Sequence, residues 1–85
     1  MKEFTYKITD EVGIHARPAG LLVKKAGEFA SEVTLIKGDK EADCKKIFAV
    51  MGLGVKKDET VRVQVSGSDE DRATAELEKF FGDNL

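Results

Sequence analysis

The sequence predicts a single α+β domain, residues 1–85, in which helices cover one face of an antiparallel sheet. Hydrophobic residues alternate with period two in some segments and follow helical spacing in others. These segments occur in the order strand, helix, strand, strand, helix, strand, helix. The composition, 41% hydrophobic and 35% charged residues in a chain of 85, is typical of one folded globular domain. The pattern does not predict the strand order.

The first two elements are a strand and a helix. Apolar and polar residues alternate from Phe4 to Ile8, which is typical of a half-buried strand. The spacing becomes helical from Ala16 to about Phe29. The only proline, Pro18, falls in the first turn of this helix, where a missing N–H loses no hydrogen bond. The helix is therefore expected to begin directly after His15.

A hairpin and a short helix follow. Strands are expected at Val33–Ile36 and Glu41–Asp43, with Gly38-Asp39 as a two-residue turn. Ile47 to Met51 forms a brief apolar helical patch, and Gly54 is expected to end it as a left-handed cap.

The last two elements are a strand and a helix. Thr60 to Val65 alternates again and predicts a strand. Ser68 is the expected N-cap of the final helix. We expect the tail Gly82–Leu85 to fray. The buried face of the helix is expected to consist of Ala73, Leu77 and Phe80.

Composition excludes several functional classes. The single cysteine, Cys44, cannot form an internal disulfide, which favours a reducing, cytoplasmic location. The chain has one histidine and no metal-binding motif, so we expect neither a metal nor a cofactor. A net charge of −2 gives no support to nucleic-acid binding. The charged, alternating segment Met1–Lys7 is neither a signal peptide nor a membrane span, and no membrane insertion is expected.

The segment Gly13–Gly20 holds the most informative residues. His15 lies at the predicted N-terminus of a helix, where unpaired N–H groups and a partial positive charge favour anions. The positive helix end disfavours the imidazolium form, so a ring nitrogen keeps a lone pair that can attack phosphorus. Arg17 is suited to a bidentate pair with phosphate oxygens. We therefore expect the helix start, Ala16 to Pro18, to stabilise a bound phosphoryl group.

Taken singly, these residues also have ordinary explanations. A histidine before a helix is often a cap or a surface residue, and an arginine in a first turn is usually solvated. Spacing alone does not name a reaction.

The run Gly-Ile-His-Ala-Arg-Pro-Ala, Gly13 to Ala19, resembles the active-site signature of the histidine-containing phosphocarrier (HPr) family of the bacterial sugar phosphotransferase system. The segment Lys45 to Gly54, the chain length and the order of elements resemble the same family. The resemblance implies an open-faced β-sandwich, with a four-stranded antiparallel sheet covered on one face by three helices.

The resemblance also implies a route for the phosphoryl group. Enzyme I would take phosphate from phosphoenolpyruvate and pass it to Nδ1 of His15, with Arg17 assisting. The A component of a sugar-specific enzyme II would then receive it. The chain would be a carrier that forms a covalent phosphohistidine, not an enzyme. A monomer is expected, since the carrier must visit two partners.

Two positions depart from the family pattern. Lys46 stands where the family has its regulatory serine, so no regulatory serine phosphorylation is expected. Residue 12 is often small or polar in the family, and here it is Val12, which offers no capping side chain. Transfer should survive, at a rate that this change could alter.

The resemblance further implies a docking surface close to His15. Val50 and part of Ile47 are expected in the core. For Phe48 and Met51, apolar residues at helical spacing, burial in the core is the competing interpretation. The expected surface, an apolar patch with a basic rim, consists of Leu21, Lys24, Lys45, Lys46, Ile47, Phe48 and Met51, with Lys25 also on the rim.

Rival functions remain at this stage. A non-transport regulatory relative would use the same fold and docking face, but His15 argues against relatives that have lost the histidine. A small nucleic-acid-binding module would need exposed aromatic residues or a basic sheet face. The strand Thr60–Val65 offers neither.

Overall fold

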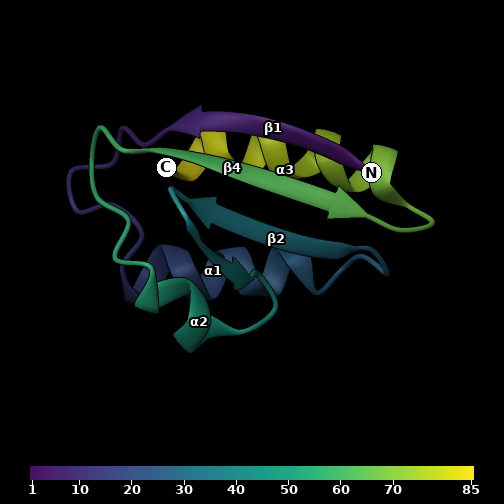
Figure 1. Cartoon of the computed structure of the whole chain (residues 1–85), viewed down its shortest axis with the longest axis horizontal. Helices are drawn as coiled ribbons and strands as arrows, with labels where there is room; N and C mark the ends of the chain where they lie inside the picture. The colour runs from purple at the N-terminus through teal and green to yellow at the C-terminus, as the bar shows by residue number, and fades with distance from the viewer.

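A computed structural model describes all residues, 1–85. Four strands form one antiparallel sheet in the order β1-β4-β2-β3. The elements are β1 (Lys2–Lys7), α1 (Ala16–Ala26), β2 (Glu32–Lys37), β3 (Lys40–Asp43), α2 (Ile47–Gly52), β4 (Thr60–Ser66) and α3 (Glu70–Asn84) (Figure 1).

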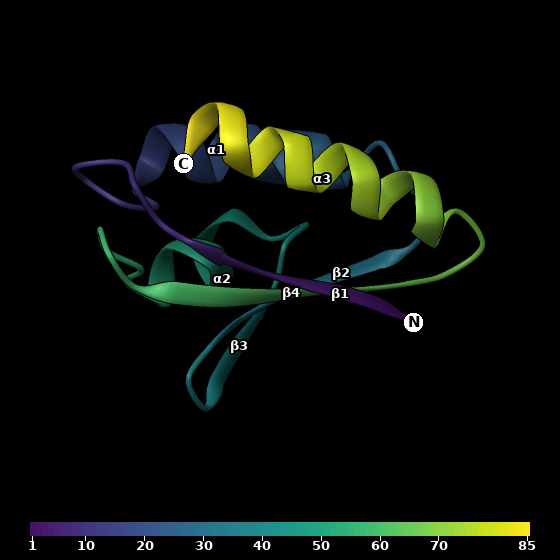
Figure 2. The same ribbon diagram turned by 90° about the horizontal axis from the view of Figure 1, so that it is seen from above.

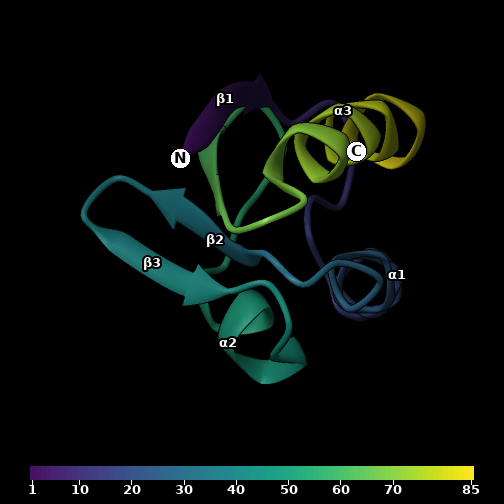
Figure 3. The same cartoon turned by 90° about the vertical axis from the view of Figure 1, so that its right-hand side faces the viewer.

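The two long helices lie side by side on one face of the sheet. Figure 2 shows α1 and α3 above the strands, and the opposite face of the sheet carries no helix. The short helix α2 lies near β3, at the edge of the sheet (Figure 3). This arrangement is the predicted open-faced sandwich, with three helices on a four-stranded antiparallel sheet.

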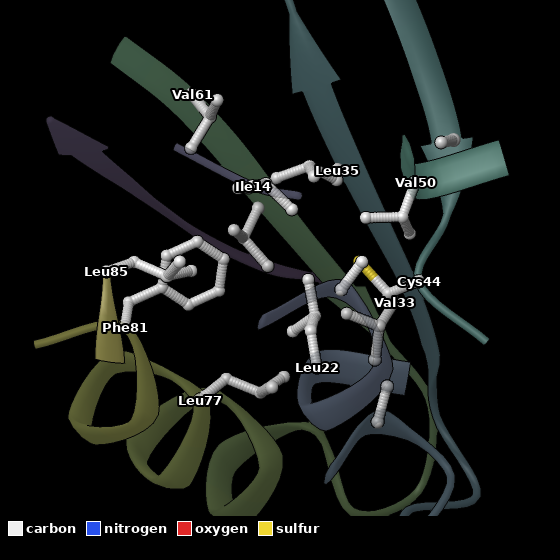
Figure 4. Packing of buried hydrophobic residues seen from close by; sticks show 14 of the residues in the cluster. Ile14, Leu22, Val33, Leu35, Cys44, Val50, Val61, Leu77, Phe81 and Leu85 are labelled. Carbon is white, nitrogen blue, oxygen red and sulfur yellow. The ribbon is translucent and has the colours of Figure 1, made fainter. Parts of the chain in front are cut away.

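The core fills the space between the sheet and the helices (Figure 4). Val61, Val63 and Val65 of β4 point into it from the centre of the sheet, each with 1% exposure or less. Leu22 of α1 and Leu77 of α3 meet them from the helix layer. β4 and β2 are each paired on both sides, so they are the two central strands of the sheet.

The predicted turns are confirmed. Lys37 pairs with Lys40 across a two-residue turn, and Gly38 has φ +61°. Gly54 follows α2 with φ +61°, a left-handed conformation that glycine adopts without steric cost.

The first helix is shorter than predicted. α1 ends at Ala26, not near Phe29. Gly27 follows as the C-cap, and glycine has a low helix propensity, which disfavours continuation of the helix. Phe29 is nonetheless buried, from the turn that leads to β2. The helical spacing of apolar residues in the sequence therefore extends beyond the helix itself.

The start of α3 also differs. Its N-cap is Asp69, not Ser68, and the Asp69 side chain does not cap its own helix. The carboxylate instead accepts hydrogen bonds from the Ala30 and Ser31 N–H groups and from the Ser31 hydroxyl. It thereby joins the start of α3 to the segment that precedes β2.

The end of α3 does not fray. The helix continues to Asn84, and Leu85 is 3% exposed. The carbonyl oxygen of Leu85 accepts hydrogen bonds from the N–H groups of Thr9 and Asp10 at 2.6 and 2.8 Å. The buried aromatic residue near this end is Phe81, at 0% exposure, whereas Phe80 is only partly buried.

Candidate functional site

His15 is the N-cap residue of α1, as predicted. Its backbone is extended, with φ −102° and ψ −167°, and its carbonyl oxygen accepts the Ala19 N–H at 2.9 Å. The imidazole makes no capping hydrogen bond with the helix and is partly exposed. The ring is thus free to meet a partner, while its backbone is held by the first turn.

The loop before His15 is fixed by short-range hydrogen bonds. Asp10 accepts the Val12 N–H with Oδ1 at 2.9 Å and the Gly13 N–H with its carbonyl oxygen at 3.1 Å. The Ile14 N–H donates to the Val55 carbonyl at 3.0 Å. We call residues 8–15, which connect β1 to α1, the acceptor loop. The contacts hold this loop together internally and attach it to Val55.

Gly13 permits the close approach of this loop to Val55. Its φ is +75°, and a Cβ at this position would lie 2.3 Å from the Val55 carbonyl oxygen. No L-residue with a side chain fits there without moving the backbone. The glycine of the motif is therefore required by packing next to His15.

The first turn of α1 offers unpaired donors beside His15. The Ala16 and Arg17 N–H groups have no acceptor, and Pro18 has no N–H. Arg17 is exposed, and its guanidinium forms no ion pair within 4.0 Å. Positive charge and free donors thus gather at one end of the helix, a setting that favours an anion.

His15 and Arg17 line the same open hollow, of about 250 Å³. Sequence reasoning missed the contribution of α3, whose last turn brings Asp83 and Asn84 to this hollow. No local signal marks these two residues, because their position depends on α3 continuing where fraying was expected. The lining consists of Asp10, His15, Arg17, Pro18, Leu21, Asp83 and Asn84.

An apolar surface lies beside the site. Phe48 is 84% exposed and Leu21 is 41% exposed, while Ile47 and Met51 are partly buried against the core. Val50 is fully buried, as expected. Helices α1 and α2 pack closely at Gly20. A Cβ atom added at this glycine would lie 3.7 Å from Ile47 Cδ1, which is van der Waals contact.

The lysines of the expected rim differ in their surroundings. Lys24 and Lys46 are exposed and form no ion pair. Lys45 donates to the Phe29 carbonyl at 2.8 Å. Lys25 is directed to α3, where its ammonium meets Glu76 Oε1 at 2.8 Å, so it does not belong to the rim.

The structure offers no support for thiol or metal chemistry. Burial raises the pKa of the Cys44 thiol to about 12, so it stays protonated and serves in packing. No group of three or more His, Cys, Asp or Glu residues is placed to hold a metal ion. None of the helices has the length and apolar character needed to cross a membrane.

Comparison with known proteins agrees with the geometry. The family model described as the PTS HPr component phosphorylation site matches residues 2–83. Phosphocarrier protein HPr of Mycoplasma capricolum is 38% identical over 83 residues, which are 98% of this chain and 93% of that protein.

Solved structures share the fold. The mycoplasma histidine-containing phosphocarrier protein has a TM-score of 0.93 at 36% identity, over 96% of this chain and 93% of that chain. An HPr dimer from Thermoanaerobacter tengcongensis has a TM-score of 0.77 at 36% identity, over 98% and 95% of the two chains. With the family model, the curated relative and the fold in agreement over nearly its whole length, this chain belongs to the HPr family of phosphocarrier components of the phosphotransferase system.

Proposed function

We propose that His15 accepts a phosphoryl group from phospho-enzyme I and donates it to the A component of a sugar-specific enzyme II. In the first step Nδ1 forms a bond to phosphorus as the bond between phosphorus and enzyme I breaks. The ring proton stays on Nε2. In the second step the P–Nδ1 bond breaks as the A component takes the group. The observation that carries the proposal is His15 beside Arg17 at an unpaired helix N-terminus, in an open hollow.

The surroundings of His15 suit both halves of this cycle. The neutral ring is a nucleophile, and the product is an anion. Arg17 lines the same hollow as His15, and the Ala16 N–H has no acceptor, so charge-assisted hydrogen bonds from both would stabilise the phosphorylated state. Pro18 fixes the helix start that presents these donors. No cofactor takes part.

The test is phosphorylation followed by intact-mass analysis. The protein is incubated with enzyme I and phosphoenolpyruvate, then weighed before and after brief acid treatment. The wild type should gain one acid-labile phosphoryl group, and His15→Ala should gain none while keeping its circular dichroism spectrum. A folded wild type that gains no phosphate, alongside an enzyme I that phosphorylates another carrier, would contradict the proposal.

We also propose that both partners dock on the apolar surface formed by Leu21, Ile47, Phe48 and Met51, with Lys24, Lys45 and Lys46 as its basic rim. Exposed apolar area next to an acceptor group favours a transient interface, and rim charges mainly speed encounter with an acidic partner. The chain would act as a cytoplasmic monomer. Lys46, in place of serine, removes the phosphoserine route of regulation.

Phe48→Ala tests the docking surface. Because Phe48 is 84% exposed, its removal should change stability by less than about 0.5 kcal/mol. The KM of the carrier in the enzyme I reaction should rise about fivefold or more, the effect of losing an interface anchor. Thr5→Ala, on the uncovered face of the sheet, is the control. An unchanged KM for Phe48→Ala would remove α2 from the interface.

A further inference from the structure

Lys37, the last residue of β2, has three oxygen atoms of the protein around its ammonium group. It donates to the carbonyl oxygens of Leu53 at 3.2 Å and Gly54 at 3.1 Å, and it pairs with Glu59 Oε1 at 3.1 Å. Its side chain is 28% exposed, so these bonds are partly shielded from water. A lysine at the end of a surface strand usually projects into solvent. The Lys37 side chain instead turns back onto the protein and contacts these three oxygens.

The three acceptors lie at the two ends of one connection, residues 53–59, which we call the support segment. Leu53 and Gly54 directly follow α2, and the ammonium meets their carbonyls where a helix C-terminus favours a cation. Glu59 lies just before β4, and its Oε1 also accepts the Lys56 N–H at 2.7 Å. Lys37 therefore closes the support segment into a compact turn.

The support segment is the surface on which the acceptor loop rests. Its Val55 carbonyl receives the Ile14 N–H at 3.0 Å, and Gly13 packs against the same oxygen. Ile14 is 3% exposed and directly precedes His15. In Figure 1 this connection from α2 to β4 runs beside the loop from β1 to α1.

The same segment begins at the end of α2, which carries Phe48. One side chain thus anchors two parts of the molecule that the proposed function uses together, the acceptor loop and the docking helix. Backbone hydrogen bonds also join Asp58 and Glu59 to Ile8, at 2.8 and 3.0 Å, at the start of the loop. The Lys57–Glu11 ion pair is a further tie, at 3.0 Å, but Glu11 is 84% exposed there. Exposed pairs of this kind contribute little.

We propose that Lys37 is a positioning residue for phosphoryl transfer. Through Leu53, Gly54 and Glu59 it holds the Val55 carbonyl in place, and this carbonyl sets the backbone position of His15 relative to α2. The inference rests on the proposed function, because it concerns the geometry of its acceptor. Group transfer is sensitive to displacements of this kind, since reacting atoms must meet within a few tenths of an ångström.

The test compares Lys37→Met with Lys40→Met. Methionine keeps the length and apolar stem of the side chain and removes the donors. Lys40 faces Lys37 across the hairpin turn and forms no ion pair, so it is a control for charge. Single-turnover phosphorylation by saturating phospho-enzyme I should slow about tenfold in Lys37→Met and stay unchanged in Lys40→Met.

A purely structural role for Lys37 would give a different result. It would lower the midpoint of urea unfolding without changing the saturated rate of the folded protein. Amide hydrogen exchange distinguishes the two roles further. Under the proposal, exchange of the Ile14 amide accelerates in Lys37→Met by a larger factor than exchange of the Val63 amide in the sheet. A saturated rate equal to that of wild type would overturn the proposal.

Two further variants keep the test decisive if Lys37→Met folds poorly. Glu59→Gln keeps an acceptor for the Lys56 N–H but loses the ion pair, and it should slow transfer in the same direction. Lys37→Arg keeps the charge and should restore most of the rate. If neither variant gives its expected rate, the proposal for Lys37 fails, and the proposed function is unaffected as long as the wild type is phosphorylated. If wild type accepts no phosphate, the proposed function fails, and exchange at Ile14 still reports on the structural link.

Discussion

At the scale of single residues, Arg17 carries the one permanent charge in the first turn of α1, and no carboxylate oxygen lies within 4.0 Å of its guanidinium. An unpaired guanidinium at the surface adds little to folding stability. Its charge becomes useful when an anion arrives at the adjacent His15. On the proposed function, Arg17 therefore acts in transfer and adds little to the fold.

Arg17→Ala should therefore separate transfer from stability. Loss of a charge-assisted hydrogen bond of about 1.5–3 kcal/mol corresponds to a rate about 10- to 100-fold slower. The free energy of unfolding should change by less than about 0.5 kcal/mol. Rapid-quench phosphorylation and urea unfolding on the same preparation measure both. A near-normal rate would remove Arg17 from the mechanism.

The sequence predicts a position in the site correctly where the residue type has only one common structural role. Pro18 fixes the start of α1, so His15 is correctly placed before it. Ser68 and Asp69 show the opposite case. Both are good N-caps by type, and the choice depends on Ser31, which is 38 residues away from Asp69 in sequence and is visible only after folding.

At the scale of elements, that same contact joins α3 to the chain entering β2. Hydrogen bonds from the Ser31 hydroxyl, and then from the Ala30 N–H, lower the pKa of Asp69 to about 2. An unperturbed aspartate has a pKa of about 3.9. Because the folded value is the lower one, Asp69 stabilises the fold fully above about pH 4, and this stabilisation is lost as the pH falls through about 2.

In Asp69→Asn, the free energy of unfolding should therefore depend less on pH below about pH 4. At pH 7 the variant should unfold at lower urea than wild type, and the difference should shrink between about pH 4 and pH 2. Urea unfolding at a series of pH values measures this. Ser31→Ala, which keeps the backbone donors, should lie between the two. A difference between wild type and Asp69→Asn that does not vary with pH would contradict the assignment.

The face of α3 was predicted one residue away from its observed position. Positions 73, 77 and 80 and positions 73, 77 and 81 both fit helical spacing. The second set is buried because the helix is rotated so that Phe81 meets β1, with Thr74 also inside. Spacing within a helix cannot reveal the direction from which the sheet approaches.

At the scale of the whole molecule, Phe81 closes the core between α3 and the edge strand β1. Its ring meets Phe4 and Tyr6 edge-on, with centroids at 5.6 and 5.5 Å. Such aromatic pairs add to the effect of burial. The strand order could not be predicted, because β1 pairs with β4, more than 50 residues later, and only this shared core selects that pairing.

Phe81→Ala should thus cost about 3–5 kcal/mol of unfolding free energy, a large part of the stability of a domain this small. Phe80→Ala removes the same atoms from a partly buried position and should cost about 1–2 kcal/mol. Urea unfolding of both variants at neutral pH gives the comparison. Equal losses would show that Phe80 shares the core.

The hollow around His15 is partly open to solvent, and the imidazole is partly exposed. A ring that two different proteins must reach in turn cannot be shut away, so water reaches it as well. On the proposed function, the phosphorylated form then has a finite lifetime set by hydrolysis. Delivery to the next protein must be faster than that lifetime, and the carrier can relay phosphate but not store it.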